Sequence, residues 1–200
     1  MTDITQRKIA VGITGASGAI YGVRLVQELL KAGHLVHLVI TEAGWQVFKD
    51  ELRWDISDRD KIISEHFSSY GEQLYYHTLR DFYAPIASGS YQHDGMIVIP
   101  CSMGTLSGIA HGASGNLLER AADVTLKEGR KLILVPRETP LHQIHLENML
   151  KVTQVGGRIV PAMPGFYQLP STMDDLIHFV VGKSLDALGI PHSLFKRWGE

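Results

Sequence analysis

The sequence predicts a three-layer α/β fold built on a doubly wound parallel sheet. Short apolar runs alternate along the chain with longer segments of helical period, the pattern of a parallel sheet covered by helices on both faces. Several of the runs are apolar enough to be buried on both sides, as central strands of such sheets are. A length of 200 residues with 44% hydrophobic content fits a single domain, residues 1–200, with a sizeable core.

Each element is predicted from a local signal. The strands are expected at 8–13, 35–41, 95–99, 131–135 and 158–160. The helices are expected at 18–32, 42–53, 103–128 with a break near 112–115, 141–155 and 172–188. Gly33 is expected to end the first helix, and Gly189 followed by Pro191 the last. Residues 54–94 have mixed polarity, and Pro85 and Gly89 indicate a loop there.

A glycine-rich turn joins the first strand to the first helix, in the order Thr14, Gly15, Ala16, Ser17, Gly18. The first N–H groups of a helix lack internal partners, and the helix dipole favours negative charge there. Glycines allow a ligand to approach the backbone closely, and the hydroxyls of Thr14 and Ser17 add hydrogen-bonding groups. The turn therefore predicts a bound phosphate, with tight strand–helix packing as the alternative explanation.

A nicotinamide-dependent oxidoreductase is one alternative, because TGASG also opens many short-chain dehydrogenases. Glu42 lies about 20 residues past the turn, where an NAD-binding acid is expected. The glycine spacing departs from G-x-G-x-x-G, however, and none of the seven tyrosines has a lysine four residues later. These two departures weigh against the NAD-dependent reading.

Ligands of doubly wound sheets bind at the carboxyl ends of the strands, so the residues after each predicted strand form the candidate site. These residues are Gly15, Ala16 and Ser17; Thr41; Ser102, Met103, Gly104 and Thr105; Arg137 and Glu138; and the segment 161–167. Small hydroxyl residues predominate and carboxylates are scarce. The composition fits a bound anion with an aromatic body better than a divalent metal.

Charged side chains near the fourth strand extend this site. Arg137 and Glu138 stand between two prolines that restrict the loop, so an arginine for a phosphate and a glutamate for a proton are expected side by side. Arg120 and Lys127 are seven residues apart on one helix face and would add cations for a leaving phosphate. A surface arginine, a capping glutamate and a solvated helix face are the alternatives.

Two further groups are weaker candidates. His142, His145 and Glu147 lie close in sequence, but no second cluster supports a metal, so packing or capping is favoured and no metal site is predicted. The single cysteine, Cys101, follows a strand without an assigned base and is interpreted as a small buried hydrophobic residue.

Composition narrows the functional classes. The net charge of −2 and pI near 6.5 give no reason to expect nucleic acid or an anionic membrane surface as a partner. The uncharged stretch 95–118 contains too many glycines and polar residues for a membrane span. No secretory signal pattern is present at the N-terminus, so a cytoplasmic protein is expected.

Four long motifs, in order along the chain, closely resemble the flavin prenyltransferases of the UbiX/Pad type. They are GITGASGAIYGVRL (12–25), PCSMGTLSGIAHGASGNLLERAADVTLKE (100–128), LILVPRETPLHQIHLENML (132–150) and PAMPGFYQLP (161–170), followed by Arg197-Trp198-Gly199. The resemblance implies a Rossmann-like flavoprotein, typically a homododecamer, that binds FMN. It implies transfer of a dimethylallyl group from dimethylallyl phosphate to N5 and C6 of reduced FMN, with the product used by a UbiD-type decarboxylase.

The resemblance also assigns residues. It places FMN against Gly15, Ala16, Ser17, Thr41, Ser102, Met103, Gly104, Thr105 and Arg137. It places the prenyl phosphate against Tyr167 and Lys183, with Lys127 and Arg120 in the same cationic pocket, and metal-independent chemistry follows from these cations. Glu138 matches the proton-transferring glutamate, Ser17 and Glu51 match further active-site residues, and Phe82 and Trp198 are the expected aromatic neighbours of the prenyl group.

Two readings on the same fold remain open at this point. One is an FMN-binding accessory subunit of a phenolic-acid decarboxylase, which turnover alone separates from the enzyme. The other is oxidative decarboxylation of cysteine derivatives, for which His34 and His37 stand in the wrong register relative to the expected active-site histidine.

Overall fold

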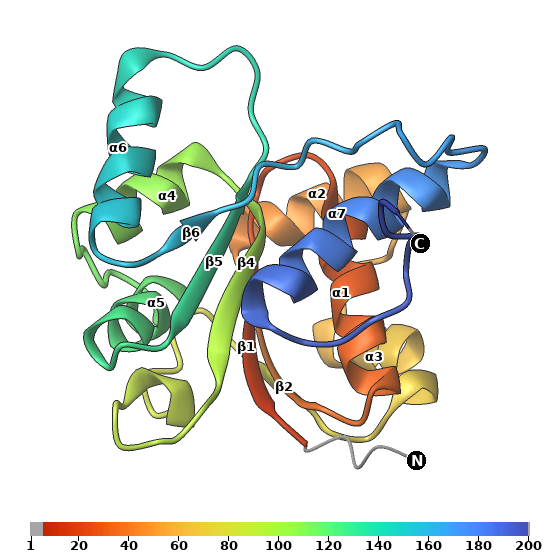
Figure 1. Ribbon diagram of the computed structural model, residues 1–200. Coiled ribbons are helices and arrows are strands. Elements are labelled where there is room, and N and C mark those ends of the chain that lie inside the picture. The colour runs from red at the N-terminus through yellow and green to blue at the C-terminus, as the bar shows by residue number, and fades with distance from the viewer. Residues whose placement is uncertain (1–5, 200) are drawn as a thin grey trace.

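A six-stranded parallel sheet organises residues 6–199, the part of the chain that this computed structural model describes (Figure 1). Its strands are β1 (Lys8–Ile13), β2 (Leu35–Ile40), β3 (Leu74–His77), β4 (Gly95–Cys101), β5 (Lys131–Pro136) and β6 (Arg158–Ile159). Their spatial order is β3-β2-β1-β4-β5-β6, so the direction of strand addition reverses between β1 and β4. Crevices that bind ligands form at such a switch point.

One face of the sheet is covered by helices α1 (Ala19–Lys31), α2 (Glu42–Leu52), α3 (Arg59–Phe67) and α7 (Met173–Leu188), with the short η1 (Ser68–Tyr70) beside α3. Their apolar residues pack on alternate residues of the strands, including Val11, Leu38 and Ile97. Trp45 and Phe48 of α2 and Phe67 of α3 are the largest side chains fully buried in this layer. This face carries the larger of the two hydrophobic clusters.

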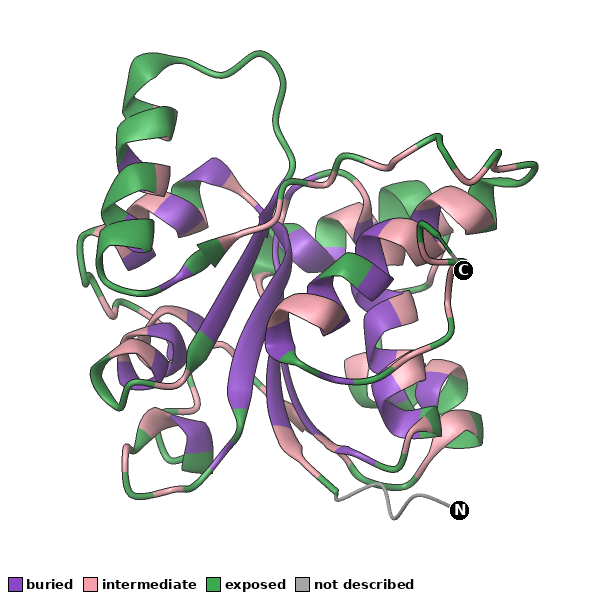
Figure 2. Ribbon diagram, viewed as in Figure 1, coloured by how far each residue is buried: buried purple, intermediate pink, exposed green. Residues whose placement is uncertain are grey.

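The opposite face carries α4 (Met103–Ala110), α5 (Leu117–Lys127), α6 (Gln143–Gln154) and the short η2 (Pro85–Ala87). Here the intervening strand residues, such as Ala10, Met96 and Leu134, face the helices. The central strands β1, β2, β4 and β5 are buried on both sides, while much of α6 and of the loop before it is exposed (Figure 2). These four strands are therefore continuous apolar runs, as predicted.

The predicted elements match the structure closely except in the segment of mixed polarity. The helix expected over 103–128 is divided between α4 and α5, and Gly189 ends α7 in the left-handed conformation with φ +81°. Residues 54–94, in contrast, contain α3 and the edge strand β3, which the sequence analysis missed. β3 is short and only partly buried, so it lacks a strong apolar signal.

A hydrogen-bonded cluster of histidine and tyrosine side chains lies beside the neighbouring strands β2 and β3. His37 is 3% exposed, its Nδ1 lies 2.8 Å from Nε2 of His77, and its Nε2 lies 2.7 Å from the Tyr91 hydroxyl. Burial, and to a smaller extent the neighbouring His77, His93 and Lys8, lowers the pKa of His37 to about 4. Neutral His37 is therefore a structural residue of the sheet.

Gly22 of α1 lies against the backbone of β4, and we expect it to be required for stability. A Cβ atom there would approach the Ile99 carbonyl oxygen to 2.6 Å, whereas one at Gly104 of α4 meets nothing within 4 Å. Gly22→Ala should lower the free energy of unfolding by about 1–3 kcal/mol in urea titrations. Gly104→Ala is the control and should leave it unchanged or raise it by up to about 1 kcal/mol. Equal stabilities would contradict this account of helix docking.

The buried His37 predicts acid sensitivity. Its folded pKa of about 4 lies below the ordinary value of 6.5, so the unfolded chain binds the proton first. Stability should be full above about pH 6.5 and fall as the pH drops toward 4, by at most roughly 1.4 kcal/mol per pH unit for one proton. Urea titrations across this range should show a shallower dependence in His37→Asn. The exposed His111→Asn is the control, and an unchanged slope in His37→Asn would assign the sensitivity elsewhere.

Candidate functional site

The candidate site lies at the carboxyl edge of the sheet, where the ends of β1 and β4 meet. Thr14 follows β1 and is fully buried. Its hydroxyl donates to the Pro100 carbonyl at 2.8 Å and accepts from the Ser102 N–H at 2.7 Å. The expectation that the Thr14 hydroxyl binds a phosphate is therefore wrong, because this hydroxyl joins the two central strand ends.

Glu51 reaches the glycine-rich turn from the last turn of α2. Its carboxylate accepts from the N–H of Gly18 at 2.9 Å and from that of Ala19 at 3.0 Å. These are first N–H groups of α1, where a negative charge is favourable. These two amides therefore already have an acceptor in Glu51, and the phosphate predicted at the turn would be bound by its other groups.

The turn also packs directly on the start of α2. A Cβ atom at Gly15 would lie 2.4 Å from Cβ of Ala43, so glycine is needed for this close approach. Thr41 begins α2 and its hydroxyl accepts from the Gly44 N–H at 3.0 Å. Gly15 and Thr41, predicted from separate strands, thus border the same corner of the site. Ala16 is buried beside the exposed Ser17.

The N-terminus of α4 forms the next part of the edge. Ser102 caps it by accepting from the Thr105 N–H at 3.3 Å, and the two hydroxyls lie 3.2 Å apart. Met103 is buried beneath them, whereas Gly104 is exposed with open space around the missing Cβ. Hydroxyls and accessible backbone therefore face outward at this helix start.

Arg137 and Glu138 follow β5 and both are exposed. The Arg137 N–H donates to the Cys101 carbonyl at 3.3 Å, which holds this loop beside the β4 end. The Glu138 carboxylate accepts from the neighbouring Thr139 N–H at 3.0 Å. A cavity of about 280 Å³ adjoins both side chains and extends to Pro161 and Met163. Arg137 and Glu138 thus follow a strand end, where the sequence placed them, and the structure adds that they line one cavity.

Tyr21, in the first turn of α1, is a further residue beside this edge that no sequence pattern indicated. Burial raises the pKa of Tyr21, and the positive charge of Arg137 partly offsets that rise, so the two side chains are electrostatically coupled. Its position three residues after Gly18, about one helical turn on, is the sequence feature that could have indicated it.

The four predicted phosphate-binding residues do not come together within one chain. Arg120 and Lys127 lie on α5, where they pair with Asp123 at 2.9 Å and with Glu128, respectively. Lys183 lies on α7, which covers the opposite face of the sheet, and Tyr167 belongs to the loop before that helix. The three-cation pocket that the sequence suggested for Arg120, Lys127 and Arg137 is not shown by the contacts of the single chain.

The two predicted prenyl-facing aromatic residues also lie in separate segments. Phe82 is 46% exposed in the connection between β3 and β4. Trp198 is 81% exposed in the C-terminal tail, and its ring meets the Tyr167 ring edge-on at 5.5 Å. Trp198 therefore adjoins a predicted phosphate ligand, while Phe82 belongs to another part of the surface.

The alternative readings of single residues lose support from their contacts. Both oxygens of Glu42 accept from the Arg59 guanidinium, at 2.8 and 2.6 Å, and this hydrogen-bonded pairing lowers the pKa of the carboxyl group. Glu42 is thus paired with Arg59, which weakens its reading as the acid that binds the ribose of NAD. His37 is committed to His77 and Tyr91. Burial raises the pKa of the Cys101 thiol to about 12, so it is no nucleophile near neutral pH.

Residues 6–199 carry neither a metal-binding cluster nor a helix that could span a membrane. No three histidine, cysteine or acidic side chains of that range gather to hold a metal ion, and the rings of His142 and His145 stack with centroids 3.5 Å apart. None of its helices is long and apolar enough to cross a bilayer.

The residues present fit FMN in the chemistry of their donors. The exposed Ser17 and Gly104, the half-buried Ser102 and Thr105, and the exposed Arg137 offer hydroxyls, open backbone and one guanidinium along a single edge. Hydroxyls and a guanidinium suit a phosphate ester and flavin carbonyls. Because Glu51 takes two amides of α1, the phosphate would be bound by other groups of this edge.

Comparisons with known proteins agree with this geometry. Residues 1–185 match the family model described as Flavoprotein. The chain is 64% identical over 200 residues, all of both chains, to the flavin prenyltransferase UbiX of Alkalihalophilus pseudofirmus.

Two solved structures share the whole fold. One is AnUbiX (PadA1) in complex with FMN and dimethylallyl pyrophosphate, with 40% identity, a TM-score of 0.88 and 98% of each chain covered. The other is a dodecameric FMN-dependent UbiX-like decarboxylase from Escherichia coli O157:H7, with 46% identity, a TM-score of 0.86, and 96% of this chain and 100% of that one covered. Identity and coverage of this extent show that the chain belongs to the Flavoprotein family and, within it, to the UbiX-type flavin prenyltransferases.

Proposed function

We propose that this protein transfers the dimethylallyl group of dimethylallyl phosphate to reduced FMN and that a UbiD-type decarboxylase uses the product. The observation that carries the proposal is the shared cavity of Arg137 and Glu138, on the same sheet edge as the hydroxyl-lined starts of α1 and α4. The edge offers binding groups for a flavin phosphate and, beside them, an acid–base residue. The relatives' names and the ligands of AnUbiX support the same reaction.

The flavin is assigned to the sheet edge. Reduced FMN, when bound, supplies the nucleophilic N5 and C6 positions. The residues proposed to hold it are Gly15, Ala16, Ser17, Thr41, Ser102, Met103, Gly104, Thr105 and Arg137. Among these, Arg137 is the charged group at the edge and is proposed to hold the flavin by bidentate hydrogen bonds.

The prenyl phosphate is assigned to Tyr167 and Lys183, with Lys127 and Arg120 completing the positive charge. Since α5 and α7 cover opposite faces of one sheet, a second copy of the chain is proposed to bring these groups together. Ile144, Leu146 and Leu150 of α6 are each more than half exposed, an apolar surface typical of contacts between subunits. A dodecamer like that of the Escherichia coli relative would supply such contacts.

Departure of phosphate requires positive charge, which lysine and arginine supply without a metal. Phe82 and Trp198 are the proposed aromatic neighbours of the electron-poor prenyl group, which a ring face stabilises. Glu138 is proposed to move a proton as phosphate leaves and as the prenyl carbons bonded to flavin N5 and C6 close a new ring. Ser17 and Glu51 are proposed as further active-site residues. The exposed Glu138 carboxylate, hydrogen-bonded to the Thr139 N–H, is accessible for that task.

Removing the titratable group of Glu138 tests the chemistry. Glu138→Gln preserves the shape, so FMN binding should persist while prenyl transfer slows by about 10²–10⁴-fold. The measurement is anaerobic single turnover of reduced FMN with dimethylallyl phosphate, followed by absorbance and product mass, with the diphosphate ester in a parallel reaction. Wild-type protein yielding no product heavier by one dimethylallyl group would favour an accessory subunit. Wild-type rates in the variant would move the proton-transfer role to another group.

The cationic residues predict turnover that needs no added metal. Dialysis against EDTA should leave the single-turnover rate within about twofold, because lysine and arginine neutralise the leaving phosphate. A matched sample receives magnesium after dialysis and should react at the same rate. Loss of activity that magnesium restores would overturn the role given to Arg120, Lys127, Arg137 and Lys183.

A further inference from the structure

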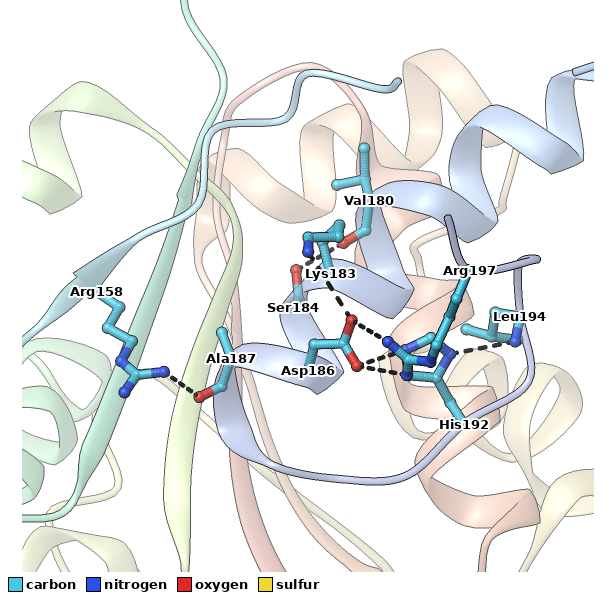
Figure 3. A network of polar contacts seen from close by, with 9 residues as sticks. All are labelled: Arg158, Val180, Lys183, Ser184, Asp186, Ala187, His192, Leu194 and Arg197. Atoms are coloured by element: carbon cyan, nitrogen blue, oxygen red, sulfur yellow. Dashed lines mark hydrogen bonds and ion pairs between the residues drawn. The ribbon is translucent and has the colours of Figure 1, made fainter. Parts of the chain in front are cut away.

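The carboxylate of Asp186, near the end of α7, is the centre of a network of positive and polar groups (Figure 3). It accepts from the Arg197 guanidinium at 2.8 and 3.2 Å, one distance to each oxygen. His192 Nε2 lies 3.1 Å from it, and the Lys183 ammonium group lies 4.0 Å away. Burial raises the pKa of Asp186, but the hydrogen bonds from Arg197 and the charges around it outweigh burial and lower it overall. One carboxylate thus faces two cations at unequal distances.

This network fastens the C-terminal tail onto α7. The backbone N–H of Leu194 donates to Nδ1 of His192, so the neutral ring carries its proton on Nε2 and donates it to Asp186. Gly182 leaves room for this packing, because a Cβ atom there would lie 2.5 Å from the Phe195 ring and 2.7 Å from that of His192. The tail is therefore packed against α7 by specific contacts.

The packed tail also contacts the loop that contains Tyr167. The Trp198 ring meets the Tyr167 ring edge-on, and Tyr167 in turn meets Phe179 of α7 with centroids 5.8 Å apart. A cavity of about 300 Å³ lies between this loop and the tail, and Tyr167, Arg197 and Trp198 are among the residues that line it. Asp186 is thereby linked to both residues assigned to the prenyl phosphate, Lys183 directly and Tyr167 through the tail.

Arg197 lies closer to the Asp186 carboxylate than Lys183 does. Arg197 engages both carboxylate oxygens by a bidentate contact, the geometry in which guanidinium and carboxylate match best. Lys183, at 4.0 Å, makes a longer and more solvated contact with one oxygen. As long as Arg197 satisfies Asp186, the Lys183 ammonium group is free to turn toward an incoming anion.

We propose that Asp186 and Arg197 are positioning residues for the phosphate of the prenyl donor, in which Arg197 holds the Asp186 carboxylate so that Lys183 stays available to that phosphate. The inference rests on the proposed function, since it takes Lys183 and Tyr167 as the phosphate ligands. Loss of Arg197 would leave Lys183 as a nearby cation for Asp186, and the donor would compete with an internal carboxylate.

The test compares Arg197→Met, Asp186→Asn and the double variant in protein loaded with oxidised FMN, which lacks the electrons for prenyl transfer, so that donor binding is measured without turnover. Calorimetric titration with dimethylallyl phosphate gives the dissociation constant, and anaerobic kinetics with reduced FMN gives KM and kcat. Arg197→Met should weaken donor binding about fivefold and raise KM similarly with kcat little changed. Asp186→Asn and the double variant should both bind more tightly than Arg197→Met, because without the carboxylate Lys183 is released.

A tail that merely stabilises the fold predicts a different order, with all three variants weakened alike, and that result would overturn the proposal. Arg59→Met is the matched control, because Arg59 makes a comparable two-oxygen contact with Glu42 between α3 and α2, outside the Asp186 network. Its donor affinity should equal that of the wild type. If the wild type itself fails to bind the donor, the proposed function fails; if it binds and the double variant does not recover, the positioning role alone fails.

Discussion

The arrangement of the site depends on one buried hydroxyl, that of Thr14. It donates to the strand end of β4 and accepts from the start of α4, so it joins the two strands between which the strand order reverses. A buried hydroxyl that uses both its donor and its acceptor fixes the separation of the groups around it. The glycine-rich turn after β1 and the hydroxyl-bearing helix start after β4 are consequently held as one edge, and Arg137 joins them through its bond to Cys101.

Carboxylates are distributed along this edge according to different physical demands. Glu51 accepts from two amides at the start of α1, where the helix dipole stabilises its negative charge. Glu138 is exposed in a loop after β5 beside a guanidinium. Both carboxylates are exposed, but Glu51 is hydrogen-bonded to the start of a helix, whereas Glu138 is hydrogen-bonded only within its own loop. A predicted helix N-terminus therefore does not by itself indicate a phosphate site, because a carboxylate of the same chain can occupy its free N–H groups.

Positive charge is divided between the faces of the sheet. Arg120 and Lys127 lie with α5, whereas Lys183 and the tail lie with α7 (Figures 1 and 3). Each of these cations has a carboxylate neighbour in its own chain, which lessens their mutual repulsion and keeps each in place. The exposed apolar residues of α6 suggest why such a division is tolerated, since assembly of copies would bury that surface and add groups from other chains.

The sequence by itself determined the parallel sheet, most element bounds, the chemistry of its carboxyl edge and the family resemblance. These follow from local signals: apolar runs, glycine and proline at element ends, and side chains placed just after strands. It missed α3 and β3, whose partial burial leaves weak patterns, and it misjudged Thr14. The tertiary structure alone decided that Glu51 caps α1, that the Thr14 hydroxyl joins the ends of β1 and β4, and that Asp186 holds Arg197 11 positions later. Each is a contact between elements, and its existence depends on how helices and loops pack on the sheet, for which sequence spacing carries no signal.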